Sequence, residues 1–152
     1  MATGDVTLFN SFRSEIGDAI HNLSSNDFFF GLVTNTAPPT QTTAGPHWAG
    51  TGTTNLATNQ VSTTAGYTGP INVSTTITDN WTISGATATF DVDDVSLTQN
   101  ADGFTDAYWG VIYNNTDANK RAICFLEMGG PVSLVAGDVS VTWNAAGVFT
   151  LS

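Results

Sequence analysis

The sequence has very little positive charge. Its 152 residues contain three Lys and Arg against 13 Asp and Glu, which gives a formal net charge of −10 at pH 7. Binding to nucleic acid is not expected, because affinity for a phosphate backbone depends on Lys and Arg. Binding to an anionic membrane is not expected for the same reason. The charge suits a protein whose copies repel one another at long range until a specific surface docks.

Cysteine and long apolar runs are also scarce. The single cysteine, Cys124, excludes a disulfide within the chain. Its place in an apolar run favours a buried thiol over a nucleophile. No apolar run approaches the roughly 18 residues of a membrane helix. The beginning, MATGDVTLFNSF, has neither a basic start nor a long apolar segment, so no secretory signal is predicted.

Common catalytic and metal-binding motifs are missing from the sequence. There is no GxSxG, P-loop, HExxH or CxxC pattern. The two histidines, His21 and His47, have no acidic neighbours at metal-ligand spacing, and both are expected to face solvent. Glu15 and Glu127 are the only glutamates, and nothing selects a carboxylate pair for glycoside cleavage. The sequence therefore predicts neither an enzyme nor a cofactor.

Two acidic segments are candidates for a cation site. Asp91, Asp93 and Asp94 lie in DVDDV, and calcium prefers such oxygen ligands. The segment NADGFTD, residues 100–106, resembles the start of a calcium loop, but Val111 occupies the position that needs a bidentate Glu. Solvated acids at the rim of a sheet are the preferred interpretation of both segments. Calcium binding is the alternative for both segments, with Asp91, Asp93 and Asp94 as the ligands in DVDDV.

Thr, Ser, Asn and Gly supply most of the polarity. Only 11% of the residues are charged but 41% are hydrophobic, so the low charge does not indicate disorder. Short alternating segments separated by turn residues predict one antiparallel β-sandwich or jelly-roll-like domain over residues 1–152. The expected strands are Phe28–Asn35, Ile71–Thr78, Trp81–Ile83, Ala86–Leu97, Ala107–Asn114, Ala122–Met128, Asp138–Asn144 and Gly147–Leu151.

One short N-terminal helix and one long insertion complete the predicted fold. Apolar residues recur every three or four positions from Leu8 to Leu23, which indicates an amphipathic helix. Residues 36–69 are rich in Thr and Gly, and we expect a flexible loop or arm with a short strand or helical turn near residues 56–62. Residues 1–7 are a second candidate arm.

Three residues are candidates for a protein interface. Trp48 is expected to dock either within its own chain or on a neighbouring subunit, because an exposed Trp in a loop is costly. Lys120 and Arg121 provide two of the three cations and lie in NNTDANKRAICFLEMGG, residues 114–130. The Asn-rich part of this segment predicts a turn between two strands, where charge beside Asp117 discourages edge pairing. Alternatively, the turn presents its positive charge to an acidic patch on a neighbouring subunit.

The aromatic residues leave a further alternative open. The sequence contains four Trp and three Tyr, which are also the residues that a sugar-binding module uses. Trp81, Trp109 and Trp143 lie within strand patterns, however, and are expected to pack in the core.

Both ends of the chain resemble a broad group of tailed-bacteriophage virion structural proteins. At the N-terminal end, LFNSFRSEIGDAIHNLSSNDFFFGLVTNTAPP, Leu8–Pro39, is similar to a helix, strand and turn of that group. At the C-terminal end, Ala107–Ser152 resembles a part of the group that has a strand ending in a turn like VLYNDT, a Lys, an apolar strand ending in two glycines, a V-T-AG connection and a VTW ending. The matching residues are Val111–Thr116, Lys120, Ile123–Gly130, Val135–Gly137 and Val141–Leu151.

The resemblance implies a capsid decoration, or cement, protein. Such a protein binds the outer surface of the major capsid protein lattice in many copies, commonly as a small homo-oligomer such as a dimer or trimer. The implied location is the virion, after synthesis in the host cytoplasm without a signal peptide. The resemblance implies no enzyme, no cofactor and no contact with nucleic acid. A tail-tube, tail or head–tail joining protein and a carbohydrate-binding or adhesion module are the alternatives.

Overall fold

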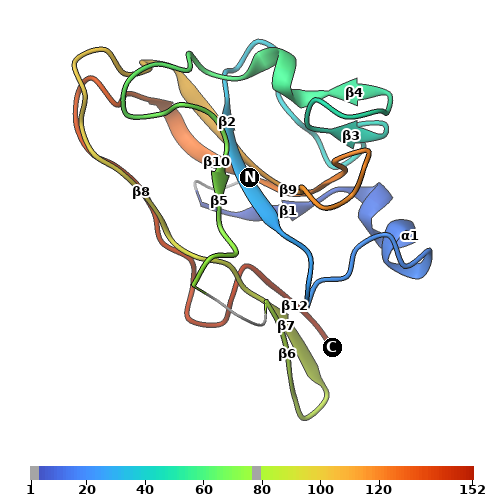
Figure 1. Cartoon of the computed structure of the whole chain (residues 1–152). Coiled ribbons are helices and arrows are strands. Elements are labelled where there is room, and N and C mark those ends of the chain that lie inside the picture. Colours follow the sequence, from blue (N-terminus) through green and yellow to red (C-terminus); the bar gives the residue numbers. More distant parts are fainter. Residues whose placement is uncertain (1–3, 77–79) are drawn as a thin grey trace.

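The computed structural model describes residues 4–76 and 80–152, which form a mainly β fold (Figure 1). A five-stranded sheet in the order β1-β10-β9-β2-β5 forms the centre, and each of its pairs is antiparallel. The strands are β1 (Val6–Leu8), β2 (Phe28–Val33), β5 (Ile71–Asn72), β9 (Ala107–Asn114) and β10 (Ala122–Val132). The predicted mainly β fold is confirmed. The jelly-roll connectivity stays a prediction.

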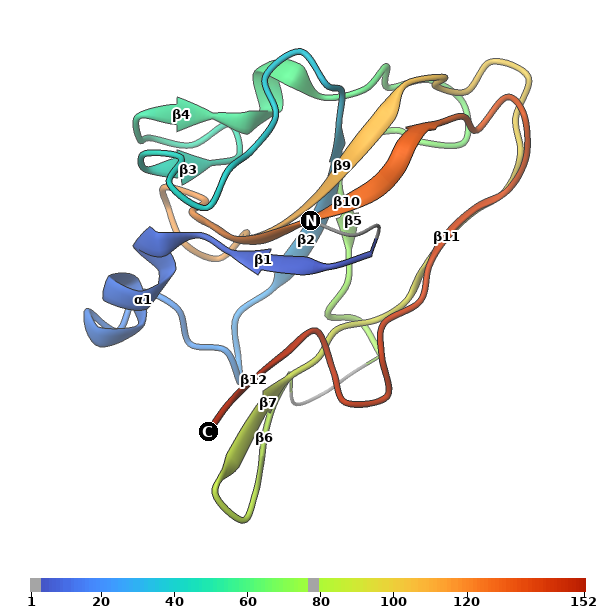
Figure 2. The ribbon, with the colours of Figure 1, turned by 180° about the vertical axis from the view of Figure 1, so that it is seen from behind.

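A second layer of strands covers one face of the central sheet. It consists of a two-stranded sheet, β11-β8, and a three-stranded sheet, β12-β7-β6. Both views of the ribbon show β8 and β11 running side by side and the hairpin of β6 and β7 projecting away from the body (Figures 1 and 2). The strands are β6 (Trp81–Ser84), β7 (Thr87–Phe90), β8 (Val95–Leu97), β11 (Val139–Val141) and β12 (Phe149–Leu151).

Strand β2 shows why the central sheet is buried on both faces. Its sequence, FFFGLV, is apolar at almost every position. Because consecutive side chains in a strand point to opposite faces, such a strand needs cover on both sides. Phe28, Phe30 and Leu32 belong to the main core between the two layers. Val33 belongs to a second core on the other face, and the half-buried Phe29 packs against it.

The Thr/Gly-rich insertion covers that other face. In it, β3 (Pro46–His47) pairs in parallel with β4 (Thr54–Asn55), and a 3-10 turn, η1 (Leu56–Asn59), follows. Trp48 and Leu56 are each 3% exposed and lie in the second core. The expected helical turn near residues 56–62 is therefore confirmed. The insertion differs from the expected flexible arm, because its few large apolar side chains are buried against the sheet.

The first described residues also differ from the expected N-terminal arm. Val6–Leu8 pair with Leu126–Cys124 of β10. The Gly4 amide donates to the Glu127 carbonyl oxygen over 2.9 Å, which extends this contact toward the N-terminus. Val6–Leu8 thus form part of the central sheet and Gly4 is hydrogen-bonded to its strand β10, whereas residues 1–3 lie outside the described part.

The helix is shorter at both ends than the predicted span from Leu8 to Leu23. Helix α1 contains Asn10–Gly17. Leu8 belongs to β1 instead, where backbone pairing with β10 outweighs its place in the helical pattern. At the other end, Ala19 has a φ of 56°, a left-handed conformation that ends a right-handed helix.

Most of the other predicted strands differ from the observed strands at one or both ends, and two are altered more strongly. The predicted strand from Ile71 to Thr78 contains β5, Ile71–Asn72, and its last residues lie outside the described part. The predicted strand from Ala86 to Leu97 is divided into β7 and β8 by residues 91–94, whose carboxylates bond to other backbone segments. By contrast, β9 has the predicted bounds, because its apolar run is clearly delimited by polar residues.

Gly31→Ala tests the close packing of the insertion on the sheet. A Cβ atom at Gly31 would lie 2.3 Å from Cη2 of Trp48. The ring would have to leave its position, and overpacking of this kind typically costs about 1–3 kcal/mol of unfolding free energy. Urea unfolding followed by tryptophan fluorescence measures the change. Gly17→Ala is the control, since a Cβ there meets nothing within 4 Å and Ala favours helix. Equal stability of Gly31→Ala and the wild type would contradict this packing.

Candidate interaction site at the β9–β10 turn

The two candidate cations lie in the turn that connects β9 to β10. The predicted hairpin is present, since Ala122 pairs with Tyr113. The Asn114 amide donates to the Arg121 carbonyl oxygen over 3.0 Å and closes the turn. The sequence alone therefore located this structural feature correctly.

One asparagine side chain organises the turn. Oδ1 of Asn114 accepts hydrogen bonds from the amides of Thr116 and Asp117, at 3.0 and 3.1 Å. Lys120 has a φ of 50°, and its amide donates to the Asp117 carbonyl oxygen over 2.8 Å. This left-handed conformation is uncommon outside glycine, so the surrounding hydrogen bonds must stabilise it.

A buried polar network lies beneath the turn. Nδ2 of Asn114 donates to Oδ1 of Asn26 at 2.8 Å and lies 3.2 Å from Nδ1 of His21. Nε2 of His21 lies 3.0 Å from Oε2 of Glu15. Exposed fractions are 0% for Asn114, 6% for His21 and 8% for Glu15. The prediction that His21 faces solvent is therefore wrong, because the early end of α1 turns the following chain inward.

The network determines which nitrogen of His21 carries the proton. Oδ1 of Asn114 is occupied by the turn amides, so the side-chain amide must direct its Nδ2 donor at the ring. Nδ1 of His21 therefore accepts, and Nε2 carries the hydrogen that it donates to Glu15. Every member of this polar network then has a hydrogen-bond partner, as burial of polar groups requires.

Arg121 is bound to carboxylates of its own chain. Its Nε lies 3.8 Å from Oε1 of Glu15, and its Nη1 lies 3.5 Å from Oδ1 of Asp117. The Arg121 amide also donates to Oδ2 of Asp117 over 3.2 Å. Much of the positive charge predicted for this turn is therefore balanced internally. Lys120 is half-buried and makes no ion pair within the described residues.

The third candidate, Trp48, docks within its own chain. Its ring stacks on Tyr113 with the centroids 5.4 Å apart and the planes 3° from parallel. Its amide donates to the Lys120 carbonyl oxygen over 2.9 Å, so the insertion is bound directly to the turn. A ring that is 3% exposed offers no face to a partner, which excludes Trp48 as a surface contact in this fold.

The second histidine is buried as well. His47, in β3, is 4% exposed, and its backbone forms an isolated antiparallel β-bridge with Arg121. The prediction that His47 faces solvent is therefore wrong. Within the described residues, its Nδ1 has no hydrogen-bond partner. His47 is buried because the insertion folds against the β9–β10 turn, and the local sequence contains no signal of this contact.

The DVDDV carboxylates bond to neighbouring backbone segments. Oδ2 of Asp93 accepts from the amides of Thr75 and Thr76, each at 2.9 Å, and from the Thr75 hydroxyl at 2.7 Å. Oδ1 of Asp94 accepts from the Trp143 amide at 2.9 Å. Across residues 4–76 and 80–152, no three His, Cys, Asp or Glu side chains are grouped to hold a metal ion. The cluster therefore fastens the loop between β7 and β8 to two other segments.

Two of these carboxyls have pKa values shifted in opposite directions. Burial by itself raises the pKa of Asp93, but hydrogen bonds from Thr75 and Thr76 outweigh it and hold the pKa below its ordinary value of 3.8. For Asp91, burial raises the pKa above 3.8, one backbone hydrogen bond opposes this, and the charges of Asp94 and Asp93 add to it.

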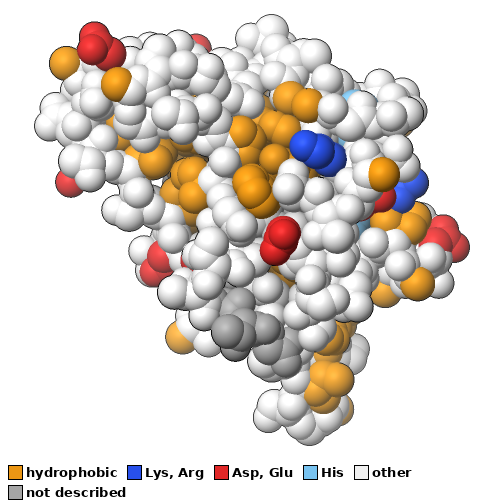
Figure 3. Space-filling model, in the orientation of Figure 1, with side chains coloured by type: hydrophobic (Ala, Val, Ile, Leu, Met, Phe, Trp, Pro, Cys, Tyr) orange, Lys and Arg blue, Asp and Glu red, His pale blue; other side chains and the backbone are white. Residues whose placement is uncertain are grey.

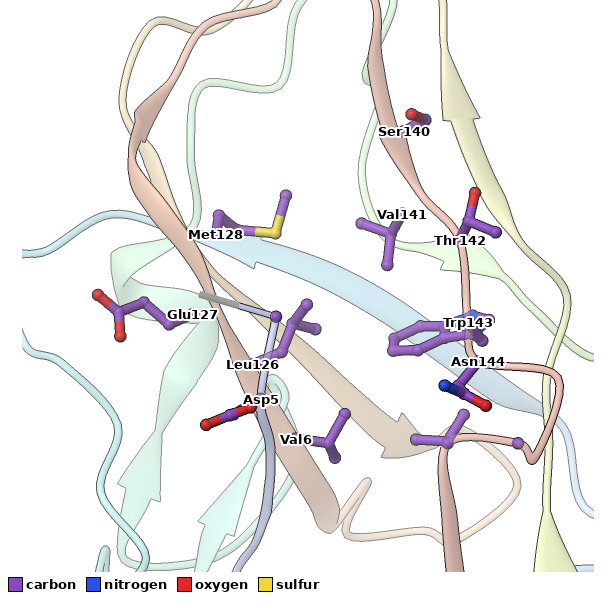
Figure 4. A pocket seen from close by; sticks show the side chains of 13 residues that line it. Asp5, Val6, Leu126, Glu127, Met128, Ser140, Val141, Thr142, Trp143 and Asn144 are labelled. Atoms are coloured by element: carbon purple, nitrogen blue, oxygen red, sulfur yellow. The ribbon is translucent and has the colours of Figure 1, made fainter. Parts of the chain in front are cut away.

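A cleft of about 450 Å³ lies between the start of the chain, β10 and the segment from β11 to β12. The ring of Trp143 faces Leu126 and Val6 across the cleft, whereas the Glu127 carboxylate points away (Figure 4). The cleft therefore brings together chiefly apolar side chains near its centre. Among the lining residues that the structure describes, no acid, base and nucleophile converge as general acid–base or nucleophilic catalysis needs.

Cys124 is buried as predicted. It is 1% exposed in β10, and burial raises the pKa of its thiol, which keeps it protonated and unreactive.

Comparisons with known proteins identify no relative: no protein-family model, no curated protein and no solved structure matches the chain. The virion resemblance of the two ends stays a prediction. In the described part of the chain, no helix has the length and apolar character needed to cross a membrane.

Asn114→Ala tests the polar network. The substitution leaves the buried His21 and the half-buried Asn26 without their shared donor and the turn amides without their acceptor. Each buried polar group left unpaired costs about 1–3 kcal/mol, so a loss of several kcal/mol of unfolding free energy is expected in urea unfolding. Asn115→Ala is the matched control, because the Asn115 side chain makes no hydrogen bond within the described residues. Similar losses for both variants would contradict the special role of Asn114.

Asp93→Asn tests the acid dependence of stability. Because the pKa of Asp93 is lower in the folded than in the unfolded state, its ionised form stabilises the fold above about pH 4, and this contribution is lost as the pH falls further. Urea unfolding should show a lower unfolding free energy for the variant than for the wild type at about pH 7. The unfolding free energy of the variant should also decline less between about pH 7 and pH 3. Asp91→Asn should instead increase the unfolding free energy at pH 7, because the raised pKa of Asp91 means that its charge destabilises the folded state there. Parallel curves for wild type and Asp93→Asn would exclude this mechanism.

Proposed function

We propose that the protein is a phage capsid decoration protein, which binds the outer surface of the major capsid protein lattice and stabilises the head. The observation that carries the proposal is that the two segments with a virion resemblance form one continuous unit. Leu8–Pro39 supplies α1 and β2, and Ala107–Ser152 supplies β9 to β12. These segments meet directly, because β2 pairs with β9 and β9 pairs with β10. Segments that share a resemblance across unrelated middle regions are expected to build a common core.

The middle of the chain packs around this unit: it supplies the edge strand β5 and the strands β6 to β8. Its outermost parts are the insertion with β3, β4 and η1, which covers one face of the central sheet, and the projecting β6–β7 hairpin (Figure 1). Peripheral segments tolerate change more readily than the core and often carry binding contacts. This division supports a common virion scaffold whose variable parts adapt to a particular capsid.

The physical properties also suit a cement protein. A decoration protein contacts several capsid subunits at once, so that several modest contacts combine into tight retention. A sheet that is buried on both faces gives a close-packed, stiff body for this purpose. The net charge of −10 keeps free copies apart until they dock.

Carbohydrate binding receives less support from the surface. Sugar-binding modules stack sugar rings on accessible aromatic side chains. Across the described residues, every Trp, Tyr and Phe is buried or partly buried. The aromatic rings instead pack on one another, as in the stacked pair of Trp48 and Tyr113.

Cosedimentation with undecorated, expanded heads of the encoding phage tests the proposal. Saturable binding is expected, with a plateau that corresponds to a fixed number of copies per head. In the same assay, Lys120→Ala is expected to weaken binding, because Lys120 makes no internal ion pair among the described residues. Arg13→Ala is the matched control, since Arg13 is an exposed cation on α1 and not a residue of the turn. Absence of saturable binding by the wild type would overturn the proposal.

A further inference from the structure

The projecting three-stranded sheet has one apolar face and one threonine face. Strand pairing aligns its side chains in rows across β6, β7 and β12, and alternate rows point to opposite faces. The apolar face, called the clasp face below, consists of Trp81, Ile83, Ala88, Phe90, Phe149 and Leu151. The row on the opposite face consists of Thr82, Thr89 and Thr150.

The clasp face continues beyond the body of the protein. Phe90, at its inner end, is 0% exposed and belongs to the main core. Toward the tip, Leu151 is 40% exposed and Ile83 is 73% exposed. Hydrophobic atoms are visible along the projecting hairpin (Figure 3). Covering the exposed outer part of this face with another apolar surface would be favourable, because it would remove Ile83 and Leu151 from water.

A recess lies beside the clasp face. It has a volume of about 370 Å³ and lies between the end of α1 and the strands β6 and β12. Its apolar lining consists of Ile16, Ala19, Leu23, Trp81 and Leu151. Its other lining residues are His21, Asn22 and Ser24. The lining contains no Asp, Glu, Lys or Arg, and neither does the segment 80–90, which includes the hairpin.

We infer that the clasp face binds a second copy of this chain, in a two-fold dimer in which Ile83 of each copy enters the recess of the other. A two-fold contact requires a surface that complements itself, and this surface contains a projection and a recess side by side. Two copies that each carry a charge of −10 can approach closely only through uncharged surface. The hairpin and the recess both meet that condition. The inference does not depend on the proposed function.

Sedimentation equilibrium of the isolated protein tests the inference. The wild type is expected to be a dimer, and Ile83→Asp is expected to raise the dissociation constant more than tenfold, because it would place a carboxylate in the apolar recess. Val135→Asp is the matched control, since it adds the same charge at another exposed apolar residue, which is 36% exposed. Thermal melting checks that the variants fold, and Leu151→Asp replaces Ile83→Asp if the latter does not.

A disulfide between two chains tests the geometry. Tagged Ile83→Cys protein is mixed with untagged Leu151→Cys protein, and a mixed disulfide is expected on mild oxidation, because each position faces the other copy. The native Cys124 does not compete, since it is 1% exposed. Val135→Cys mixed with Leu151→Cys is the control and should give no specific product.

Three outcomes would overturn the inference. The first is a monomeric wild type at the highest soluble concentration. The second is an assembly that is larger than a dimer or that Ile83→Asp leaves intact. The third is a dimer without the mixed disulfide. If the wild type is monomeric and Ile83→Asp abolishes head binding, a capsid subunit covers the clasp face instead. Failure of head binding by a normal dimer, by contrast, would overturn the proposed function alone.

Discussion

Burial of the central sheet on both faces is the constraint on which the rest of the structure depends. Strands β2 and β9 are apolar on both sides, so a single covering layer would leave one face in water. The strands β6 to β8, β11 and β12 cover one face, and the insertion covers the other. The insertion contains few large apolar residues, but Trp48 and Leu56 are placed where the second core needs them. A segment with a loop-like composition is thereby packed in place.

The same burial explains the polar network under the β9–β10 turn. Strand β9 ends at Asn114, whose side chain is enclosed once α1 and the insertion pack around the turn. A buried polar side chain is costly unless it is hydrogen-bonded, and here Glu15, His21 and Asn26 supply the partners. Arg121 completes the arrangement through its two carboxylate contacts. Arg121, one of the two cations at this turn, therefore has a structural role.

The solvent-exposed surface of the protein has two kinds of region. Most of it is polar and acidic, so that like charge opposes contact with another copy or with other anions through this part of the surface. The clasp face is apolar, uncharged and carried on a hairpin that projects from the stiff body. A stiff body that carries a localised apolar surface is consistent with the proposed role in assembly.

The sequence by itself determined the features that depend on neighbouring residues. Alternation and turn residues located β9, β10 and the turn between them, and the apolar run around Cys124 predicted its burial. Tertiary structure alone decided which polar and aromatic residues are enclosed. His21 meets Asn114 across 93 positions, and Trp48 stacks on a ring of β9, so no local pattern could reveal either contact. Periodicity reports which face of an element is apolar, whereas the choice of what covers that face depends on packing between distant segments.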